Sequence, residues 1–204
     1  MKIVLALAAA LLVLAGCGSG GDTTATDPNS GSGAMPTEIP AAAGDVRSRN
    51  VVMVMDTGSP ELCLGPVAES WPPQCSGPAI AGWRWADHQG TFESQQDIRW
   101  GSYAVTGTWD GEVFTATEAI PADLYDPIPQ PEPTYPTPAT EYSDRELAEI
   151  AEEIGDLPGA QSFYADDAGH VLVDVIYDDG SLQAWADAEY GAGVVVVSSA
   201  LVDA

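Results

Sequence analysis

Positively charged side chains are almost missing from this chain of 204 residues. It contains one lysine and five arginines against 31 acidic residues, and its formal net charge is −25. A surface this negative is repelled by the phosphates of nucleic acids and of anionic lipids, and no cluster of basic residues offsets the repulsion locally. The composition therefore excludes a nucleic-acid partner.

Histidine and cysteine are also scarce, which limits metal binding and catalysis. The two histidines, His88 and His170, belong to no metal-ligand spacing, and the sequence lacks the motifs of serine hydrolases, zinc proteases and phosphate-binding loops. The acidic pairs at 166–167 and 178–179 do not follow the alternating oxygen ligands of a calcium loop. We expect no metal and no cofactor, and we predict that both acidic pairs are turn residues.

The amino terminus has the pattern of an export signal. Lys2 precedes an apolar run of 11 residues, Ile3–Val13, which is too short to span a bilayer as a mature helix. The string LAGC that ends at Cys17 resembles the lipobox of bacterial lipoproteins. This resemblance implies that residues 1–16 are cleaved, that Cys17 is acylated, and that the protein is anchored to the membrane on its extracytoplasmic side. The alternative is an ordinary secretory signal with a chance cysteine.

Export also determines the chemistry of the remaining cysteines. Without Lys2 the mature chain has a charge of 5 − 31 = −26, and it lies in a compartment where thiols oxidise. Once Cys17 is acylated, only Cys63 and Cys75 are left to pair. We therefore expect a disulfide between these two residues.

Two segments of biased composition divide the mature chain. Residues 17–45 are mostly Gly, Ser, Thr, Ala and Pro, which cannot bury enough surface to fold, so they are predicted to be a flexible tether. Residues 126–140, within a linker region at 121–140, carry six prolines and are predicted to be a semi-rigid spacer, with a docking peptide as the alternative. The bodies between them, 46–120 and 141–204, are expected to fold separately.

The first body, residues 46–120, has the signals of β-strands. Residues 51–54 and 80–85 are β-prone runs, and the apolar residues alternate between 103 and 109. Asp110-Gly111 separates two alternating segments, as in a tight hairpin turn. We predict a small antiparallel sheet that closes toward a barrel, with an OB-like barrel as the candidate.

The second body, residues 141–204, combines helical and strand patterns. Ser143–Glu146 is a capping box, and apolar residues recur at helical spacing from 147 to 154. The remaining predicted elements are strands at 163–164 and 171–177, a helix at 182–190 and a strand at 194–197. Helix, strand, strand, helix, strand is a ferredoxin-like layout without its first strand, so we predict an α+β sandwich with both helices on one face.

A second resemblance is carried by three sequence segments and covers most of both bodies. They are PELCLGPVAESWPPQCSGP at 60–78, GSYAVTGTWDGEVFTAT at 101–117 and YDDGSLQAWADAEYGAGVVVVSSAL at 177–201. They resemble an uncharacterised family of small secreted or lipid-anchored bacterial proteins. The resemblance implies that Cys63 and Cys75 belong to the family pattern, and it implies no catalytic role.

Tryptophans concentrate in the first body. Indole rings can stack on sugar faces or anchor a protein interface, whereas packing in a small core is the alternative for each ring. We therefore treat five of the six tryptophans as candidate ligand-binding residues: Trp71, Trp83, Trp85, Trp100 and Trp109.

The string Asp56-Thr57-Gly58-Ser59 resembles the active-site motif of aspartic proteases. That chemistry needs two carboxylates that share one proton, and the sequence has one such motif, so a symmetric dimer would have to supply the second. A polar turn after a strand is the alternative. We expect a lipid-anchored, non-catalytic binding module of the cell envelope, with an envelope protein or a glycan as its partner. An envelope hydrolase that uses Asp56 is the second hypothesis.

Overall fold

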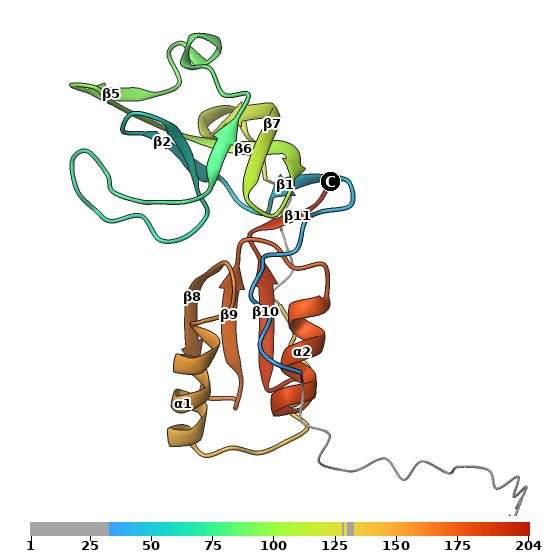
Figure 1. Ribbon diagram of the computed structural model, residues 1–204. Helices are drawn as coiled ribbons and strands as arrows, with labels where there is room; N and C mark the ends of the chain where they lie inside the picture. The colour runs from blue at the N-terminus through green and yellow to red at the C-terminus, as the bar shows by residue number, and fades with distance from the viewer. Residues whose placement is uncertain (1–32, 128, 130–132) are drawn as a thin grey trace, which may run out of the picture. The chain divides into compact units, whose positions relative to one another are not determined.

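The computed structural model describes residues 33–127, 129 and 133–204, so the signal sequence, Cys17 and the first part of the tether lie outside the described residues. The described residues form two β-sheets and two α-helices (Figure 1). The predicted α+β class is therefore confirmed. None of the helices in this part of the chain is long and apolar enough to cross a membrane.

A closed five-stranded barrel forms most of the first body. Its strands lie in the order β6-β2-β3-β4-β7, and β7 pairs with β6 to close the ring. Neighbouring strands are antiparallel except β4 and β7, which are parallel. The predicted barrel is confirmed. The strands are β2 (Val52–Asp56), β3 (Pro60–Cys63), β4 (Ala79–Ala81), β6 (Ile98–Trp109) and β7 (Val113–Pro121).

The β6–β7 hairpin follows directly from the sequence. Tyr103, Val105 and Trp109 point into the barrel because successive side chains of a strand alternate between its faces. At the turn, Asp110 Oδ1 accepts hydrogen bonds from the backbone N–H groups of residues 112 and 113, and these bonds lower the pKa of Asp110. Gly111 has a φ of 101°, which explains the glycine. The predicted hairpin is thus present.

The predicted strand at 80–85 is shorter than expected. β4 ends at Ala81, because Gly82 adopts a φ of 76° and turns the chain. Trp85 instead begins a short 3₁₀ helix, η1 (Trp85–His88). After η1, the short strand β5 (Glu93–Gln95) pairs antiparallel with β6.

Two strands that the sequence pattern did not reveal extend the barrel sheet. β1 (Asp45–Ser48) pairs with β6 on one side and with β11 (Leu201–Asp203) on the other. Leu201 is fully buried in the same hydrophobic cluster as the barrel core. The expectation of two wholly separate bodies is therefore wrong at this point, because the last strand of the second body completes the sheet of the first.

The second body contains a three-stranded sheet covered by both helices. Its elements follow the predicted order: α1 (Asp144–Ile154), β8 (Ala160–Ala165), β9 (Val171–Val175), α2 (Ser181–Tyr190) and β10 (Val195–Ser199). Val171, Val173 and Val175 share one face of β9 and lie in one buried cluster with residues of both helices. Both helices therefore cover that face, as predicted.

The strand arrangement in this sheet differs in one respect from the full ferredoxin-like layout. β8 is antiparallel to β9, whereas β10 pairs directly and in parallel with β9. In the full layout another strand lies between the two parallel strands. Since that strand is missing here, β9, α2 and β10 form an unsplit βαβ unit.

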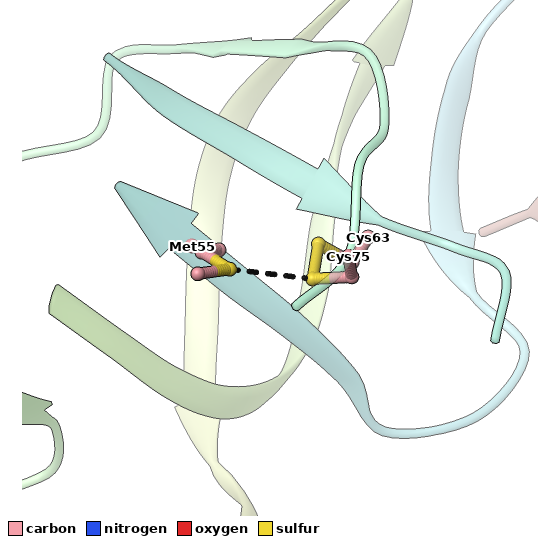
Figure 2. The surroundings of a disulfide bond; sticks show 3 residues. All are labelled: Met55, Cys63 and Cys75. Atoms are coloured by element: carbon pink, nitrogen blue, oxygen red, sulfur yellow. Dashed lines mark hydrogen bonds between the residues drawn. A yellow bond between two sulfur atoms is a disulfide. The ribbon is translucent and has the colours of Figure 1, made fainter. Parts of the chain in front are cut away.

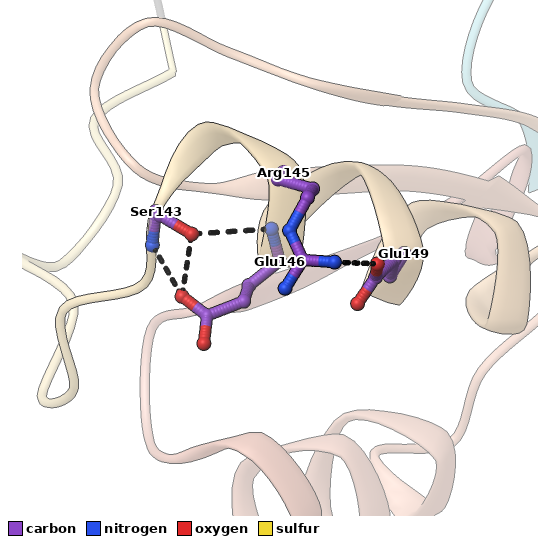
Figure 3. Close-up of polar contacts among 4 residues, drawn as sticks. All are labelled: Ser143, Arg145, Glu146 and Glu149. Carbon is purple, nitrogen blue, oxygen red and sulfur yellow. Dashed lines mark hydrogen bonds and ion pairs between the residues drawn. The ribbon is translucent and has the colours of Figure 1, made fainter.

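The capping box at the start of α1 is confirmed (Figure 3). The backbone N–H of Glu146 donates to Ser143 Oγ at 3.4 Å, and the Glu146 carboxylate accepts from the Ser143 N–H at 2.8 Å. The hydrogen bonds from Ser143 lower the pKa of Glu146. One turn on, Arg145 forms an ion pair with Glu149. The two hydrogen bonds between Ser143 and Glu146 satisfy backbone N–H groups that a helix end otherwise leaves unpaired.

The end of the predicted tether packs on the folded body. Ile39 and Ala42 contact the barrel core, and the Pro40 carbonyl accepts a hydrogen bond from Trp109 Nε1 at 2.9 Å. Met35 packs against the core of the second body. A flexible tether that extends to residue 45 is therefore wrong, because these few apolar side chains are enough to fix its last part.

The end of the Pro-rich spacer also contacts the second body. The backbone N–H of Ala139 donates to the Ala192 carbonyl at 2.8 Å. His170, which is buried, lies between the Pro136 carbonyl, 3.1 Å from Nε2, and the Asp166 carboxylate, 2.9 Å from Nδ1. This end of the spacer is thus held by specific polar contacts.

The two acidic pairs are turn residues, as predicted. Asp166 Oδ1 accepts from the backbone N–H groups of Ala168 and His170, and Asp178 Oδ1 accepts from those of Gly180 and Leu182. Burial acts to raise the pKa of Asp166, but its hydrogen bonds hold that pKa below the usual value. Both side chains therefore stabilise local backbone turns.

Candidate functional site: an aromatic groove on the barrel

Four of the five candidate tryptophans are buried, which corrects the sequence prediction for Trp83, Trp85 and Trp109. Trp83, Trp85, Trp100 and Trp109 are buried, each with at most 8% of its surface exposed. Trp83, Trp85 and Trp109 fill the barrel interior and cannot offer their faces to a ligand, whereas Trp100 belongs to a smaller buried cluster with Met55 and Cys63. Trp71 differs from them, since 67% of its surface is exposed.

A disulfide loop between β3 and β4 presents Trp71. The predicted bond between Cys63 and Cys75 is present, with an S–S distance of 2.03 Å and a Cα–Cα distance of 5.9 Å (Figure 2). Cys75 Sγ also lies 3.7 Å from Met55 Sδ. Because a half-cystine has no hydrogen to donate, this is a van der Waals contact. Within the loop, Ala68 and Gln74 pair as an isolated bridge, so Trp71 lies at the tip of a closed structure.

The Trp71 ring is oriented by a contact with the barrel. The planes of the Trp71 and Trp100 rings lie at 90° to each other, with the ring centroids 5.1 Å apart, a favourable edge-to-face geometry for two aromatic rings. Trp100 also lines a groove of about 530 Å³, together with the apolar side chains of Met53, Phe92 and Leu124. Leu124 is 75% exposed. Trp71 therefore adjoins the groove through its contact with Trp100, and we call Trp71 and this groove together the aromatic groove.

Polar groups line the same groove. Glu93 lies opposite Trp100 in the β5–β6 register, and Asp123, Thr91 and Ser102 also contribute to the lining. The loop around Thr91 is held in place by the Tyr103 hydroxyl, which donates to the Thr91 carbonyl at 3.0 Å. A tyrosine hydroxyl is protonated and able to donate at neutral pH, and burial raises the pKa of Tyr103 further. The groove thus combines aromatic surface with carboxylates and hydroxyls.

Asp56 is held by structural contacts at the end of β2. Its Oδ1 accepts from the Gly58 N–H at 2.9 Å, and its Oδ2 accepts from Trp85 Nε1 at 2.8 Å and lies 3.1 Å from Arg99 NH2. The side chain is buried, and Arg99 also lies over the Trp85 ring. A carboxylate with both oxygens engaged is poorly placed to activate water. The geometry favours the polar-turn interpretation over the protease motif.

Sequence reasoning identified Trp71 and Trp100 but missed the rest of the groove. Phe92, Glu93 and Leu124 lie outside any recognisable motif, and only the pairing of β5 with β6 and the end of β7 bring them beside Trp100. Among the described residues there is no group of three or more His, Cys, Asp or Glu side chains placed to hold a metal ion. Comparisons with protein-family models, with curated proteins and with solved structures found no match for this chain.

Proposed function

We propose that this protein is a lipid-anchored, non-catalytic binding module on the extracytoplasmic side of the membrane, and that its aromatic groove binds a glycan. The observation that carries the proposal is the exposed Trp71 ring, held against Trp100 by a disulfide loop. A large aromatic side chain that is exposed yet held in place commonly marks a binding site.

The lining of the groove matches the chemistry of a sugar chain. Sugar rings have apolar faces that stack on indole, and they carry hydroxyls that donate to carboxylates. Glu93 and Asp123 supply such acceptors, while Thr91 and Ser102 supply hydroxyl groups. The groove has no basic side chain, so an uncharged glycan fits it better than an acidic ligand.

The strand order of the barrel supports the OB-like assignment. Its five strands, numbered along the chain, run 1-2-3-5-4-1 around the barrel with the third and fifth parallel, which is the OB order. OB-folds bind oligosaccharides and oligonucleotides on the face of their second and third strands. Here these strands are β3 and β4, and the loop that joins them carries Trp71.

Replacement of Trp71 tests the glycan proposal. We expect Trp71→Ala in the full-length chain, purified in mild detergent, to weaken binding of neutral β-1,4-linked oligosaccharides by about 10-fold or more, because one ring-stacking contact is lost. Isothermal titration with cello- and chito-oligosaccharides measures this effect. Tyr164→Ala, which removes an exposed aromatic residue from β8, is the matched control and should bind like the unchanged protein. Equal binding by Trp71→Ala, or no binding at all by the unchanged protein, would contradict the glycan proposal.

Acylation of Cys17 is part of the same proposal and is tested separately. A chain with a net charge of −26 gains no attraction to anionic lipids, so a stable membrane association needs a covalent anchor with two acyl chains or more. Cys17→Ser should abolish labelling with radioactive palmitate and shift the protein from the membrane fraction to the soluble or unprocessed fraction. If the variant is labelled and fractionates like the unchanged protein, the lipoprotein assignment is wrong.

A further inference from the structure

Two of the five arginines in this acidic chain line one cavity, and they differ from the others in their partners. Arg84, Arg99 and Arg145 each form an ion pair with an aspartate or glutamate. Within the described residues, no carboxylate lies within 4.0 Å of the side-chain nitrogens of Arg47 or Arg49. Carboxylates outnumber guanidinium groups heavily in this chain, so an arginine is expected to have a carboxylate partner. Two arginines at one cavity without such a partner are therefore available to bind an anionic ligand.

The sheet directs both arginines to the same side. Arg47 is the exposed residue between buried Val46 and Ser48 on β1. The pairing continues one step beyond β1, because the Arg49 N–H donates to the Ala200 carbonyl at 2.8 Å. Residues two apart on a strand share a face and lie about 6.6 Å apart. β1 and the residue that follows it, next to the edge strand β11, therefore present two adjacent guanidinium groups.

The cavity beside these groups has the size of a small-molecule site. It measures about 690 Å³, and its lining residues are Arg47, Arg49, Asn50, Val51, Tyr125, Pro127 and Pro129. Tyr125 is positioned by a hydrogen bond from its N–H to the Ala122 carbonyl. Its ring and Val51 supply apolar surface, while Asn50 supplies an amide. It shares no residue with the aromatic groove.

We propose that this cavity, the arginine pocket, binds a small organic dianion, such as a phosphomonoester or a dicarboxylate with an attached ring or apolar group. Guanidinium groups bind phosphate and carboxylate through paired N–H donors. Two of them match a ligand of charge about −2, which a phosphomonoester approaches at neutral pH. The negative charge of the rest of the protein, including Asp123 and Asp126 within two residues of Tyr125, repels anions that lack these paired contacts.

The test uses phenyl phosphate and benzoate as probes for the full-length chain in mild detergent. Titration followed by the NMR shifts of the amides of residues 47–51 and 125 should show saturable binding of phenyl phosphate, at least 10-fold tighter than that of the monoanion benzoate. Arg47→Ala and Arg49→Ala should each weaken it by about 10-fold or more, and Arg47→Lys should fall between because lysine keeps the charge but loses the paired donors.

Two controls separate site binding from net charge. Arg84→Ala and Arg145→Ala change the net charge by the same amount at exposed ion pairs elsewhere, and both should bind phenyl phosphate like the unchanged protein. If they weaken binding as much as Arg47→Ala does, or if phenyl phosphate does not saturate, the proposal is wrong. If vesicles with phosphatidylglycerol bind the Cys17→Ser variant through Arg47 and Arg49 while phenyl phosphate does not bind, the anion source is a lipid and the small-ligand proposal is wrong.

Discussion

Changing Cys63 and Cys75 together to serine is expected to lower the free energy of unfolding by about 3 kcal/mol. The bond closes a loop between residues 12 positions apart, and in the loop-entropy model it stabilises the fold by restricting the unfolded chain. A small barrel depends more on such a bond than a large domain does, because it buries a smaller fraction of its surface. Urea unfolding of the full-length protein, followed by tryptophan fluorescence, measures the change.

Glycan binding should also weaken in the same double variant. Without the bond the loop loses its closed ends, so Trp71 is no longer held against Trp100 and glycan binding should weaken even where the barrel stays folded. Reduction of the unchanged protein serves as the control, since it should reproduce the urea midpoint of the double variant and leave that variant unaffected. Two titratable thiols in the exported native protein would refute the disulfide.

The second large effect is expected for Asp56→Ala, which should lower the free energy of unfolding by about 3 kcal/mol. The change removes a buried acceptor from Trp85 Nε1 and from the Gly58 N–H, and hydrogen bonds to a charged group contribute roughly 1.5 to 3 kcal/mol each. Arg99 is 44% exposed and regains water when its partner is lost, so the full penalty of an unpaired buried charge does not apply.

Asp56→Asn is the matched variant, and it separates structure from catalysis. The amide keeps one acceptor oxygen for Trp85 or Gly58 but loses the ion pair, so we expect a smaller loss of stability than for alanine. Urea unfolding of both variants measures this, and casein digestion at acidic pH measures hydrolysis. Acid-dependent cleavage by the unchanged protein that both variants lose would support the hydrolase hypothesis and contradict the structural role.

The sequence predicted the elements that carry a strong local signal. The capping box at Ser143, the β6–β7 hairpin at Asp110-Gly111 and both helices lie where the patterns indicated, because each depends on contacts between residues near one another in the chain. The predicted export signal made the cysteine pairing predictable, since the expected acylation of Cys17 leaves only two thiols to pair. β1 and β11 were missed because strands of four and three residues have too little alternation to be recognised.

The candidate sites were only partly predictable, for a related reason. Composition alone identified the tryptophans, but which of them is exposed depends on the three-dimensional packing of the barrel, and that packing leaves Trp71 outside. The arginine pocket gave no signal at all, because Tyr125 is separated from Arg47 by most of the barrel in sequence. It is formed where the segment after β7 returns to β1, which lies between β6 and β11 in the sheet.

By itself, the sequence determined the local properties: the acidic charge, the predicted export signal, the two helices, the hairpin and the availability of one cysteine pair. The tertiary structure alone decided which side chains meet across the sheets: that β11 joins β1, that Asp56 is engaged by Arg99 and Trp85, and that Trp71 is exposed beside a groove. The physical reason is the separation along the chain between the residues that interact. Capping, turns and periodicity act over a few residues. Closure of the barrel instead pairs residues up to about 50 positions apart, such as Val52 and Tyr103, and β1 pairs with β11 across more than 150 positions, so neighbouring residues in the chain give no sign of these contacts.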